Sequence, residues 1–426
     1  MRILLYSANF APEPTGIGKY SGEMAAWLAG RGHEVRVICA PPYYPSWKVH
    51  PDYRWPPYRR ETQGRLRIWR APLWVPANPG GLKRALHLLS FALSSLPIAL
   101  SQVFWKPQLV LVVAPFLSCA PGALACARLA GARSWLHIQD FEVDAAFEMG
   151  LLRGKFLRQL VTGCERALLR RFDVVSTISR KMLERLTEKG VGREQAVHFP
   201  NWVSAEQIQP LDRPSTYRGE LGLTDGQRVV LFSGTLGPKQ GLLIIPQVAR
   251  LLRHRPDIHF VVCGDGVMKE SLAQECAGLA NVHLLPLQPL ERLCDLLNLA
   301  DIHLLTQLGG AEDLVLPSKL TGMLASGRPV MATCNPGTEM AAVLSSCGLI
   351  SPPEDAVALA DAIRVLADDP AHRQQLGQAA RRFALGHLAA QAILEAFEAQ
   401  LRRITLDSGL KTSASVAALP DHRHEA

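Results

Sequence analysis

The chain opens with Met1-Arg-Ile-Leu-Leu-Tyr-Ser7, a short apolar run typical of a buried strand. The loop Asn9-Phe-Ala-Pro-Glu-Pro-Thr-Gly16-Ile-Gly18 follows, and an amphipathic helix then ends at Gly30-Arg-Gly32. A second strand is predicted at Glu34-Val-Arg-Val-Ile-Cys39. This order predicts a βαβ unit, and Gly16 and Gly18 predict a place in its first loop where a phosphate or a sugar approaches the backbone.

Strand and helix patterns alternate along most of the remaining sequence. Further apolar strand-like runs occupy residues 109–113, 134–138 and 174–177. A polar, proline-containing stretch over residues 204–226 indicates a linker. The alternation then resumes, with strands predicted at residues 228–233, 259–263, 282–285, 302–305, 329–333 and 348–350. The pattern predicts an α/β protein with two Rossmann-like, doubly wound domains, each built on a parallel sheet.

These boundaries divide the chain into four parts. Residues 1–205 are predicted to form the first Rossmann-like domain, and residues 206–388 the second. Residues 389–405 have apolar positions at helical spacing, which predicts a C-terminal helix that packs back on the first domain. Residues 406–426 are polar and low in aromatics, which predicts a disordered tail.

Composition limits the class of protein. With 426 residues, of which 48% are hydrophobic and 20% charged, the chain is typical of a globular protein with more than one core. Its net charge of +8 favours an anionic partner, and the basic residues are not interleaved with aromatics in the way a nucleic-acid surface requires. Nine cysteines without CxxC or Cys/His spacing argue against a disulfide framework and a zinc site. No secretory signal is recognised at the start, so we expect a cytoplasmic protein.

One long apolar stretch, residues 82–105, differs from the rest of the sequence. Pro97 and several serines interrupt it, which argues against a membrane-spanning helix. We expect a helix that lies in the headgroup plane of an anionic membrane surface, on the inner face of the plasma membrane. Its basic neighbours would assist, namely Arg59, Arg60, Arg65, Arg67, Arg70, Lys83 and Arg84. The alternative is a buried helical hairpin of the first domain.

The segment Asp313-Leu-Val-Leu-Pro-Ser-Lys319-Leu-Thr-Gly-Met-Leu-Ala-Ser-Gly327 places an acid, a serine and a lysine at the start of a helix. The Ser318 hydroxyl and the free N–H groups of a helix N-terminus bind anionic oxygens, and Lys319 adds a positive charge. Asp313 is suited to accept a hydrogen bond from a sugar hydroxyl. The segment predicts a diphosphate site; the alternative is an ordinary capped helix.

Several motifs together carry a family resemblance. Besides the segment above, they are Phe232-Ser-Gly-Thr-Leu-Gly237-Pro-Lys239-Gln-Gly241 and Val262-Cys-Gly264-Asp-Gly266. With two Rossmann-like halves, they resemble the retaining glycosyltransferases of family 4, which have the GT-B architecture of two domains facing a cleft. The runs Ala40-Pro-Pro-Tyr-Tyr-Pro45, Leu136-His-Ile-Gln-Asp-Phe-Glu-Val-Asp144 and Phe199-Pro-Asn-Trp202 resemble, more narrowly, enzymes of exopolysaccharide assembly such as that of colanic acid.

The resemblance implies a reaction. A sugar would pass from a nucleotide-diphosphate donor, GDP-fucose by the narrower likeness, to a polyprenyl-diphosphate-linked glycan, with its anomeric configuration retained. No cofactor or metal would be required. The first domain would bind the acceptor and the second the nucleotide sugar.

The resemblance also implies roles for individual residues. Ser233, Gly234 and Lys239 would approach the diphosphate, while Gly264 and Gly266 would let the nucleotide come close to the backbone. Asp313, Ser318 and Lys319 would hold the sugar and the phosphates. His137 and Asp140, at the end of a predicted strand, would orient the donor sugar and the acceptor hydroxyl; Glu142 and Asp144 have a weaker claim, because acids after a strand commonly cap the next helix.

The chain departs from the family pattern at three positions. Gly322 stands where many members carry a second glutamate, Thr235 at an arginine position and Gln240 at a lysine position. Glu312 is an alternative to Asp313 for the first acid. A nucleotide-sugar epimerase of the same fold and a non-catalytic partner of an assembly complex therefore stay open as alternatives. A nicotinamide dehydrogenase is disfavoured, because the first loop lacks the GxGxxG spacing.

Overall fold

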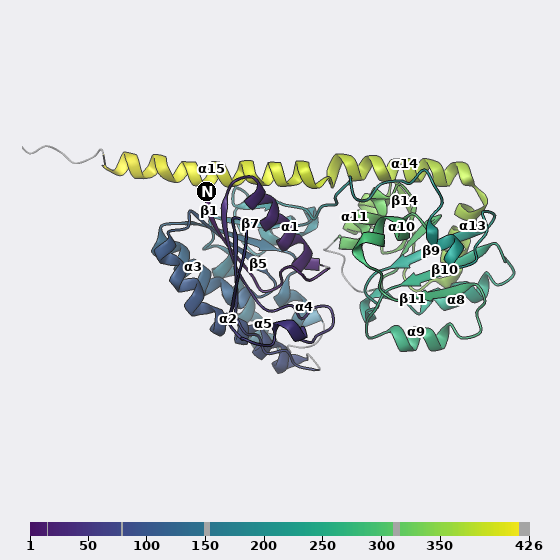
Figure 1. Ribbon diagram of the computed structural model, residues 1–426, viewed down its shortest axis with the longest axis horizontal. Helices are drawn as coiled ribbons and strands as arrows, with labels where there is room; N and C mark the ends of the chain where they lie inside the picture. The colour runs from purple at the N-terminus through teal and green to yellow at the C-terminus, as the bar shows by residue number, and fades with distance from the viewer. Residues whose placement is uncertain (15, 78–79, 149–153, 310–315, 417–426) are drawn as a thin grey trace, which may run out of the picture. The chain divides into compact units, whose positions relative to one another are not determined.

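The computed structural model describes residues 1–14, 16–77, 80–148, 154–309 and 316–416 (Figure 1). Contacts divide the chain into two compact units. The first contains Met1–Thr177, Leu186–Phe199 and the chain from Leu394 onward, and the second contains Ile178–Arg185 and Pro200–Ile393. Each unit has its own sheet with its own core, which confirms the predicted α/β architecture of two doubly wound domains.

The sheet of the first unit has the strand order β3-β4-β2-β1-β5-β6-β7-β8. All neighbours are parallel except β3 and β4. The central strands are continuous apolar runs, as expected where helices cover both faces. The strands are β1 (Arg2–Ser7), β2 (Glu34–Cys39), β3 (Arg59–Gln63), β4 (Leu66–Arg70), β5 (Leu109–Ala114), β6 (Arg133–Ile138), β7 (Val174–Thr177) and β8 (Ala196–His198). The chain order reverses at β1 and β5, and ligands of such sheets bind beyond the carboxyl ends of the strands at that point.

The helices of this part of the chain follow its strands in the expected alternation. They are α1 (Gly16–Gly30), α2 (Gly81–Ser101), α3 (Ala120–Ala130), α4 (Glu142–Glu148), α5 (Lys155–Leu169) and α6 (Arg180–Glu188). Short 3-10 turns lie between them, at η1 (Pro51–Tyr53), η2 (Gln102–Trp105) and η3 (Leu117–Cys119).

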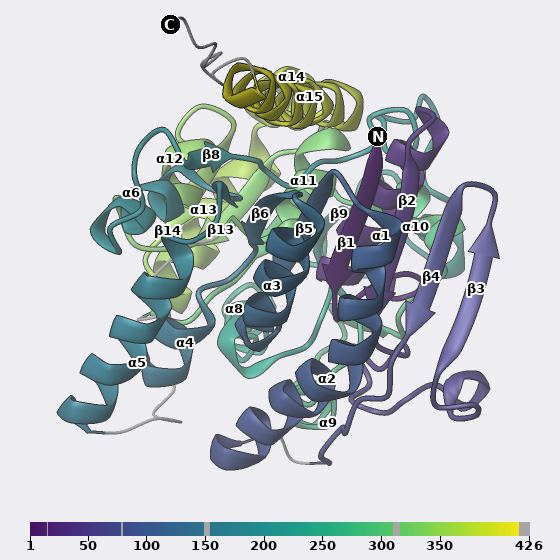
Figure 2. The ribbon, with the colours of Figure 1, turned by 90° about the vertical axis from the view of Figure 1, so that its left-hand side faces the viewer.

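Helix α2 packs beside α3 (Figure 2). Its side chains are distributed in an unusual way. Its buried face carries two polar side chains that have partners inside the unit. The His87 ring is hydrogen-bonded to the Trp74 carbonyl oxygen, and the Ser95 hydroxyl to the Tyr6 hydroxyl. Its outer face is an apolar stripe at helical spacing that continues into η2, made of Leu82, Leu86, Leu89, Leu93, Leu100 and Phe104. Together α2 and η2 form a 25-residue apolar segment, and 22% of an 18-residue apolar window within it is buried. The alternative of a buried hairpin is therefore wrong for this helix.

The sheet of the second unit has the order β11-β10-β9-β12-β13-β14, and all its strands are parallel. The strands are β9 (Arg228–Ser233), β10 (Ile258–Cys263), β11 (Val282–Leu285), β12 (Ile302–Leu305), β13 (Val330–Thr333) and β14 (Gly348–Ser351). Apolar cores cover both faces. The helices and 3-10 turns are α7 (Thr216–Glu220), η4 (Pro238–Gln240), α8 (Ile244–Leu251), α9 (Lys269–Glu275), η5 (Leu290–Arg292), α10 (Leu293–Leu297), α11 (Ser318–Ala325), α12 (Glu339–Leu344), α13 (Ala356–Asp368) and α14 (Pro370–His387).

The last helix, α15 (Ala390–Val416), is anchored on the first unit. The Phe397 ring stacks on Phe199 at 4.1 Å between centroids and meets Trp135 edge-on at 5.2 Å. Glu398 is buried beside His33, with Glu398 Oε1 3.0 Å from the ring nitrogen Nε2. Disorder was predicted from residue 406, but the chain is helical to Val416, while residues 417–426 lie outside the described residues.

Candidate active site

Two loops meet at the carboxyl edge of the second sheet. The Gly234 N–H after β9 donates to the Cys263 carbonyl at the end of β10, at 2.9 Å. A Cβ at Gly264 would lie 1.9 Å from the Gly234 oxygen, and one at Gly266 would lie 2.4 Å from the Leu236 oxygen. Gly264 and Gly266 were predicted to let a nucleotide approach the backbone. The structure gives a more immediate reason for glycine at both positions, because a side chain there would clash where the two loops pack closely.

Lys319 lies against this pair of loops. A Cβ at Gly234 would be 3.4 Å from Lys319 Cδ and 3.9 Å from its Nζ. The ammonium donates to the side-chain oxygen of Gln240 and sits 4.2 Å above the Phe232 ring. Burial lowers the pKa of Lys319 to about 7. The lysine is thus held by neutral partners, and an anion arriving beside it would favour its charged form.

The N-terminus of α11 adds hydrogen-bond donors to the same edge. Ser318 is the first helical residue, and the preceding Pro317 provides no side-chain cap. The first hydrogen bond of the helix runs from the Leu320 N–H to the Pro317 carbonyl, at 2.9 Å. Within the described residues the N–H groups of Ser318 and Lys319 have no acceptor. Free N–H groups beside a lysine are suited to bind phosphate oxygens.

The remaining predicted residues of this unit are placed as follows. Ser233 is buried at the end of β9, next to Gly234. Lys239 is exposed in η4, and among the described residues its ammonium makes no ion pair. Its neighbour Gln240 meets Lys319 instead, so the structure does not bring Lys239 into the cluster. The predicted Asp313 lies outside the described residues.

Sequence reasoning missed Gln307, which follows β12 at the same edge. Its backbone N–H donates to Thr333 Oγ1 at 2.9 Å. Its side-chain oxygen is buried and has no donor among the described residues. A Cβ at Gly241 would lie 3.2 Å from the Gln307 backbone oxygen, so the glutamine contacts the loop that carries Gln240. No sequence motif marks this glutamine; only the pairing of strands places it there.

His137 in the first unit is an interior residue, 3% exposed. Its Nδ1 lies 2.9 Å from Ser176 Oγ, and its Nε2 lies 2.9 Å from the Gln139 side-chain amide nitrogen. Burial lowers the pKa of His137 to about 3, so the ring is neutral. This geometry fits a structural histidine rather than the predicted contact with a sugar. Asp140, just past the end of β6, is exposed.

The two acids that follow Asp140 serve the fold. Glu142 Oε2 accepts from the N–H groups of Phe116 and Leu117, at 3.0 and 3.1 Å. Burial raises the pKa of Glu142. Asp144 lies 2.9 Å from Lys189 Nζ. Helix capping was the alternative to a site role for both; Glu142 instead caps the loop after β5, and Asp144 forms an ion pair with the buried Lys189.

The first glycine loop has one structural and one open glycine. A Cβ at Gly18 would lie 2.6 Å from Glu13 Oε2, and Glu13 accepts from the backbone N–H groups of Tyr43 and Tyr44, at 3.2 and 3.1 Å. Gly18 therefore makes room for a buried carboxyl, whose pKa is raised by burial. Gly16 has φ +59° and open space around it. Of the two, only Gly16 leaves its backbone accessible to a ligand.

The structure contains no cluster suited to a metal ion within the residues it describes. No three His, Cys, Asp or Glu side chains come together there. The nine cysteines are thiols outside any disulfide, and seven of them are buried.

Comparison with known proteins identifies the family. Residues 15–202 match the glycosyl transferase 4-like domain, and residues 215–383 match the glycosyl transferases group 1. The chain is 47% identical over 348 residues to the putative colanic acid biosynthesis glycosyl transferase WcaI of Escherichia coli K12, covering 80% of this chain and 85% of that protein.

Solved structures show the same fold. Sucrose-phosphate synthase from Thermosynechococcus elongatus aligns over 96% of this chain and all of its own, with a TM-score of 0.73 and 16% identity. Anabaena HepE in complex with UDP aligns over 95% of this chain and all of its own, with a TM-score of 0.68 and 14% identity. The predicted GT-B fold and the predicted family are thereby confirmed. The chain is a member of the glycosyltransferases that join a 4-like N-terminal domain to a group 1 C-terminal domain.

Proposed function

We propose that this glycosyltransferase moves a sugar from a nucleotide-diphosphate donor to a lipid-linked glycan in exopolysaccharide assembly of the colanic acid type. The pathway is suggested by the name of the Escherichia coli relative, and a nucleotide donor by the UDP complex of HepE. GDP-fucose is the first donor to test. The observation that carries the proposal is Lys319, held without an acidic partner among the described residues, beside the free start of α11.

The donor diphosphate is proposed to sit between Gly234, Lys319 and the N-terminus of α11. As the bond from the anomeric carbon to the diphosphate breaks, negative charge grows on the leaving oxygen. The Lys319 ammonium and the N–H groups of α11 stabilise that charge more in the transition state than in the bound donor. The hydroxyls of Ser233 and Ser318 are further donors in this proposal, and a metal is not required for it.

Retention of the anomeric configuration is also part of the proposal. The acceptor oxygen attacks on the face from which the diphosphate leaves, and the leaving phosphate oxygen takes the acceptor proton. One C–O bond breaks and one forms, so no carboxylate nucleophile is needed. Asp140, exposed beyond β6, is proposed to orient the acceptor hydroxyl, and Asp313 stays a predicted contact of the sugar.

A lipid-linked acceptor accounts for the apolar stripe of α2. A soluble protein gains nothing from six large apolar side chains on the outer face of one helix. The polar inner face is bonded to β1 through Tyr6 and to the loop at Trp74, which favours a helix lying along the membrane surface over one crossing it. Lys83 and Arg84 at its start favour an anionic surface. We place the protein on the cytoplasmic side, where free thiols persist.

The test is a panel of GDP- and UDP-sugars. A ligand that binds only the native state raises the unfolding temperature, and slow hydrolysis of the same compound reports catalysis. We expect one nucleotide sugar to do both and to be transferred to a polyprenyl-diphosphate glycan. The proposal fails if no nucleotide sugar stabilises the protein or is hydrolysed; stabilisation without turnover would favour the non-catalytic partner.

A further inference from the structure

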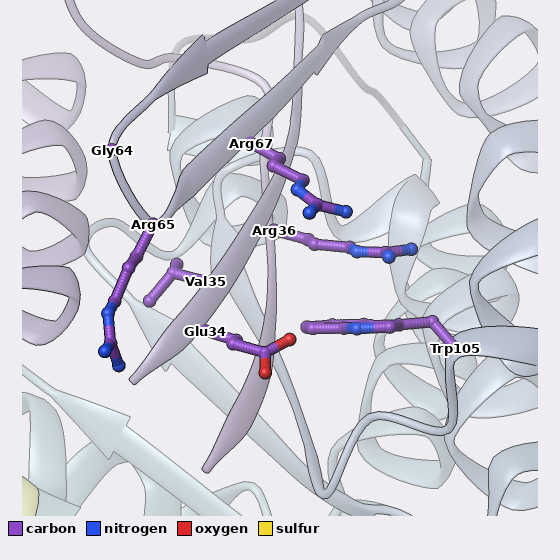
Figure 3. Close-up of a pocket in the computed structure, with 7 residues that line it drawn as sticks. All are labelled: Glu34, Val35, Arg36, Gly64, Arg65, Arg67 and Trp105. Atoms are coloured by element: carbon purple, nitrogen blue, oxygen red, sulfur yellow. The ribbon is translucent and has the colours of Figure 1, made fainter. Parts of the chain in front are cut away.

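A hollow of about 300 Å³ opens at the edge of the first sheet where its parallel strands begin (Figure 3). We call it the arginine pocket. It is lined by Glu34, Val35, Arg36, Gly64, Arg65, Arg67 and Trp105. The candidate active-site residues follow the opposite, carboxyl ends of the strands. Within the first unit, the pocket therefore lies at the edge of the sheet opposite to the one that Gly16 and Asp140 follow.

The register of two strands creates the pocket. Arg36 on β2 and Arg67 on β4 are direct partners, so both side chains leave the same face of the sheet. The Arg36 guanidinium stacks 4.1 Å from the Trp105 ring and 5.2 Å from the Trp69 ring. Figure 3 shows Arg67, Arg36 and Trp105 one above another. The Arg60 guanidinium on β3 lies 4.9 Å from the centre of the same Trp69 ring.

The charges of this cluster are not balanced. Arg36, Arg60 and Arg67 make no ion pair with any described residue, and Glu34 is the one acid that lines the pocket. Burial, and then the nearby charges of Arg67 and Arg60, lower the pKa of Arg36. By contrast, Arg70 on the opposite face of β4 is buried against Glu61, with Arg70 Nε 2.8 Å from Glu61 Oε1. The buried arginine is thus paired within the fold, whereas Arg36 is half-buried and Arg60 and Arg67 are exposed, so that these guanidinium groups stay available to an oxyanion from outside.

The pocket is continuous with the apolar stripe of α2. Trp105 is the last residue of η2, and its neighbour Phe104 is 90% exposed. Gln102 joins the two features, because its side-chain oxygen accepts from Arg36 Nη1 at 2.8 Å. An apolar side chain that enters a bilayer at Phe104 would bring lipid phosphates to the level of the pocket.

We propose that the arginine pocket binds the phosphate of an anionic lipid headgroup while α2 lies on the membrane. The inference rests on the proposed membrane association and adds a specific headgroup site to it. Paired guanidinium groups bind phosphate through two parallel hydrogen bonds, which a diffuse positive surface does not provide. The sequence shows no aromatic-interleaved basic stripe, but the structure brings Trp69 of β4 and Trp105 of η2 against Arg36. The adjoining apolar stripe favours a lipid over a nucleic acid.

The test compares Arg67→Gln with Arg193→Gln. Both remove one exposed arginine of the first unit, but Arg193 lies outside the pocket. We expect Arg67→Gln to weaken sedimentation with phosphatidylglycerol/phosphatidylcholine vesicles about tenfold, Arg36→Gln/Arg67→Gln to weaken it more, and Arg193→Gln to change it less than about twofold. Unfolding temperatures check that each variant is folded, and nucleotide-sugar hydrolysis in solution should be the same in all of them.

Three results would overturn the proposal. Equal losses in Arg67→Gln and Arg193→Gln would mean that only overall charge matters. Arg67-dependent binding of glycerol 3-phosphate, measured by tryptophan fluorescence, with unchanged vesicle binding would assign the pocket to a soluble phosphate. Tighter Arg67-dependent binding of an oligothymidine than of vesicles would assign it to nucleic acid. Because none of these readouts needs turnover, they are independent of the donor panel.

Discussion

Two lysines, one buried in the first unit and one half-buried in the second, are held in opposite ways. In the first unit, Lys189 Nζ lies 2.9 Å from a carboxylate oxygen of Asp144 and 2.6 Å from one of Glu165. In the second, Lys319 has an amide oxygen and a phenyl ring as its partners among the described residues. The charge of a lysine that is paired with acids of the fold is already balanced, whereas the charge of a lysine with neutral partners stays available to a ligand. The comparison assigns Lys189 to stability and Lys319 to function.

Replacing Lys189 with Met should have the largest effect on stability. Two carboxylates would remain buried without their counter-charge, which typically costs about 3–5 kcal/mol of unfolding free energy. Urea unfolding followed by the fluorescence of Trp135 and its neighbours measures this. Activity per folded molecule should stay unchanged; a stable variant with impaired turnover would reverse the assignment.

Replacing Lys319 with Ala should instead lower turnover about a hundredfold, because a positive charge that stabilises the leaving diphosphate is lost. Its unfolding free energy should change by less than about 1 kcal/mol, since no buried acid loses a partner. Initial rates with the donor found in the panel give the result. Wild-type turnover in this variant would remove Lys319 from the site.

The pH dependence of donor binding should follow Lys319. Burial lowers its pKa to about 7 in the free protein, so the lysine is charged below that pH and neutral above it. Affinity for a nucleotide sugar, whose diphosphate stays ionised throughout, should fall about tenfold as pH rises from 6.5 to 8.5. Lys319→Arg should bind independently of pH over this range, because arginine stays protonated. A wild-type profile as flat as that of Lys319→Arg would contradict the assignment.

The lowered pKa also affects folding. The unfolded chain, with an ordinary lysine pKa of 10.5, binds more protons than the native state between pH 7 and 10.5. Stability contributed at this site therefore rises with pH across that window. Lys319→Ala should lack this rise, which a comparison of urea midpoints at pH 7 and 9 would detect.

The smallest effect is expected for Gln240→Leu. The amide oxygen orients the Lys319 ammonium without changing its charge, so its loss should cost about 1 kcal/mol, or about fivefold in kcat/KM. Glu275→Gln, on an exposed helix of the same unit, is the matched surface control. A loss as large as that of Lys319→Ala would mean that Gln240 itself contacts the donor.

Much of the fold was predictable because both sheets are built from uninterrupted apolar runs separated by glycine-containing turns. The proximity of Gly234, Ser318 and Lys319 was predictable too. Gly234 follows a strand and the other two residues begin a helix, and both places lie at the carboxyl edge of the sheet. The tail was misjudged, because a polar composition does not reveal that α15 continues to Val416 once it is anchored by Phe397.

The roles of Gly18, His137 and the arginines depend on contacts between distant parts of the chain. A glycine is needed at position 18 because the Glu13 side chain occupies the space of a Cβ there. Glu13 is held in that place by the backbone N–H of Tyr43, some thirty residues away. His137 is buried beside Ser176 of the neighbouring strand, and that burial keeps its ring neutral. Arg36 and Arg67 become a pair only through the register of β2 and β4. Local pattern carries no information about such pairs, so these residues needed the structure.

The most direct test of the account is the binding of GDP and UDP to the wild type and to Lys319→Ala at pH 6.5, measured by calorimetry. We predict that at least one nucleotide binds the wild type and that the variant binds it at least about tenfold more weakly, while Lys189→Met binds it normally. Equal affinity of the wild type and Lys319→Ala would show that the diphosphate lies elsewhere and would contradict the assigned site.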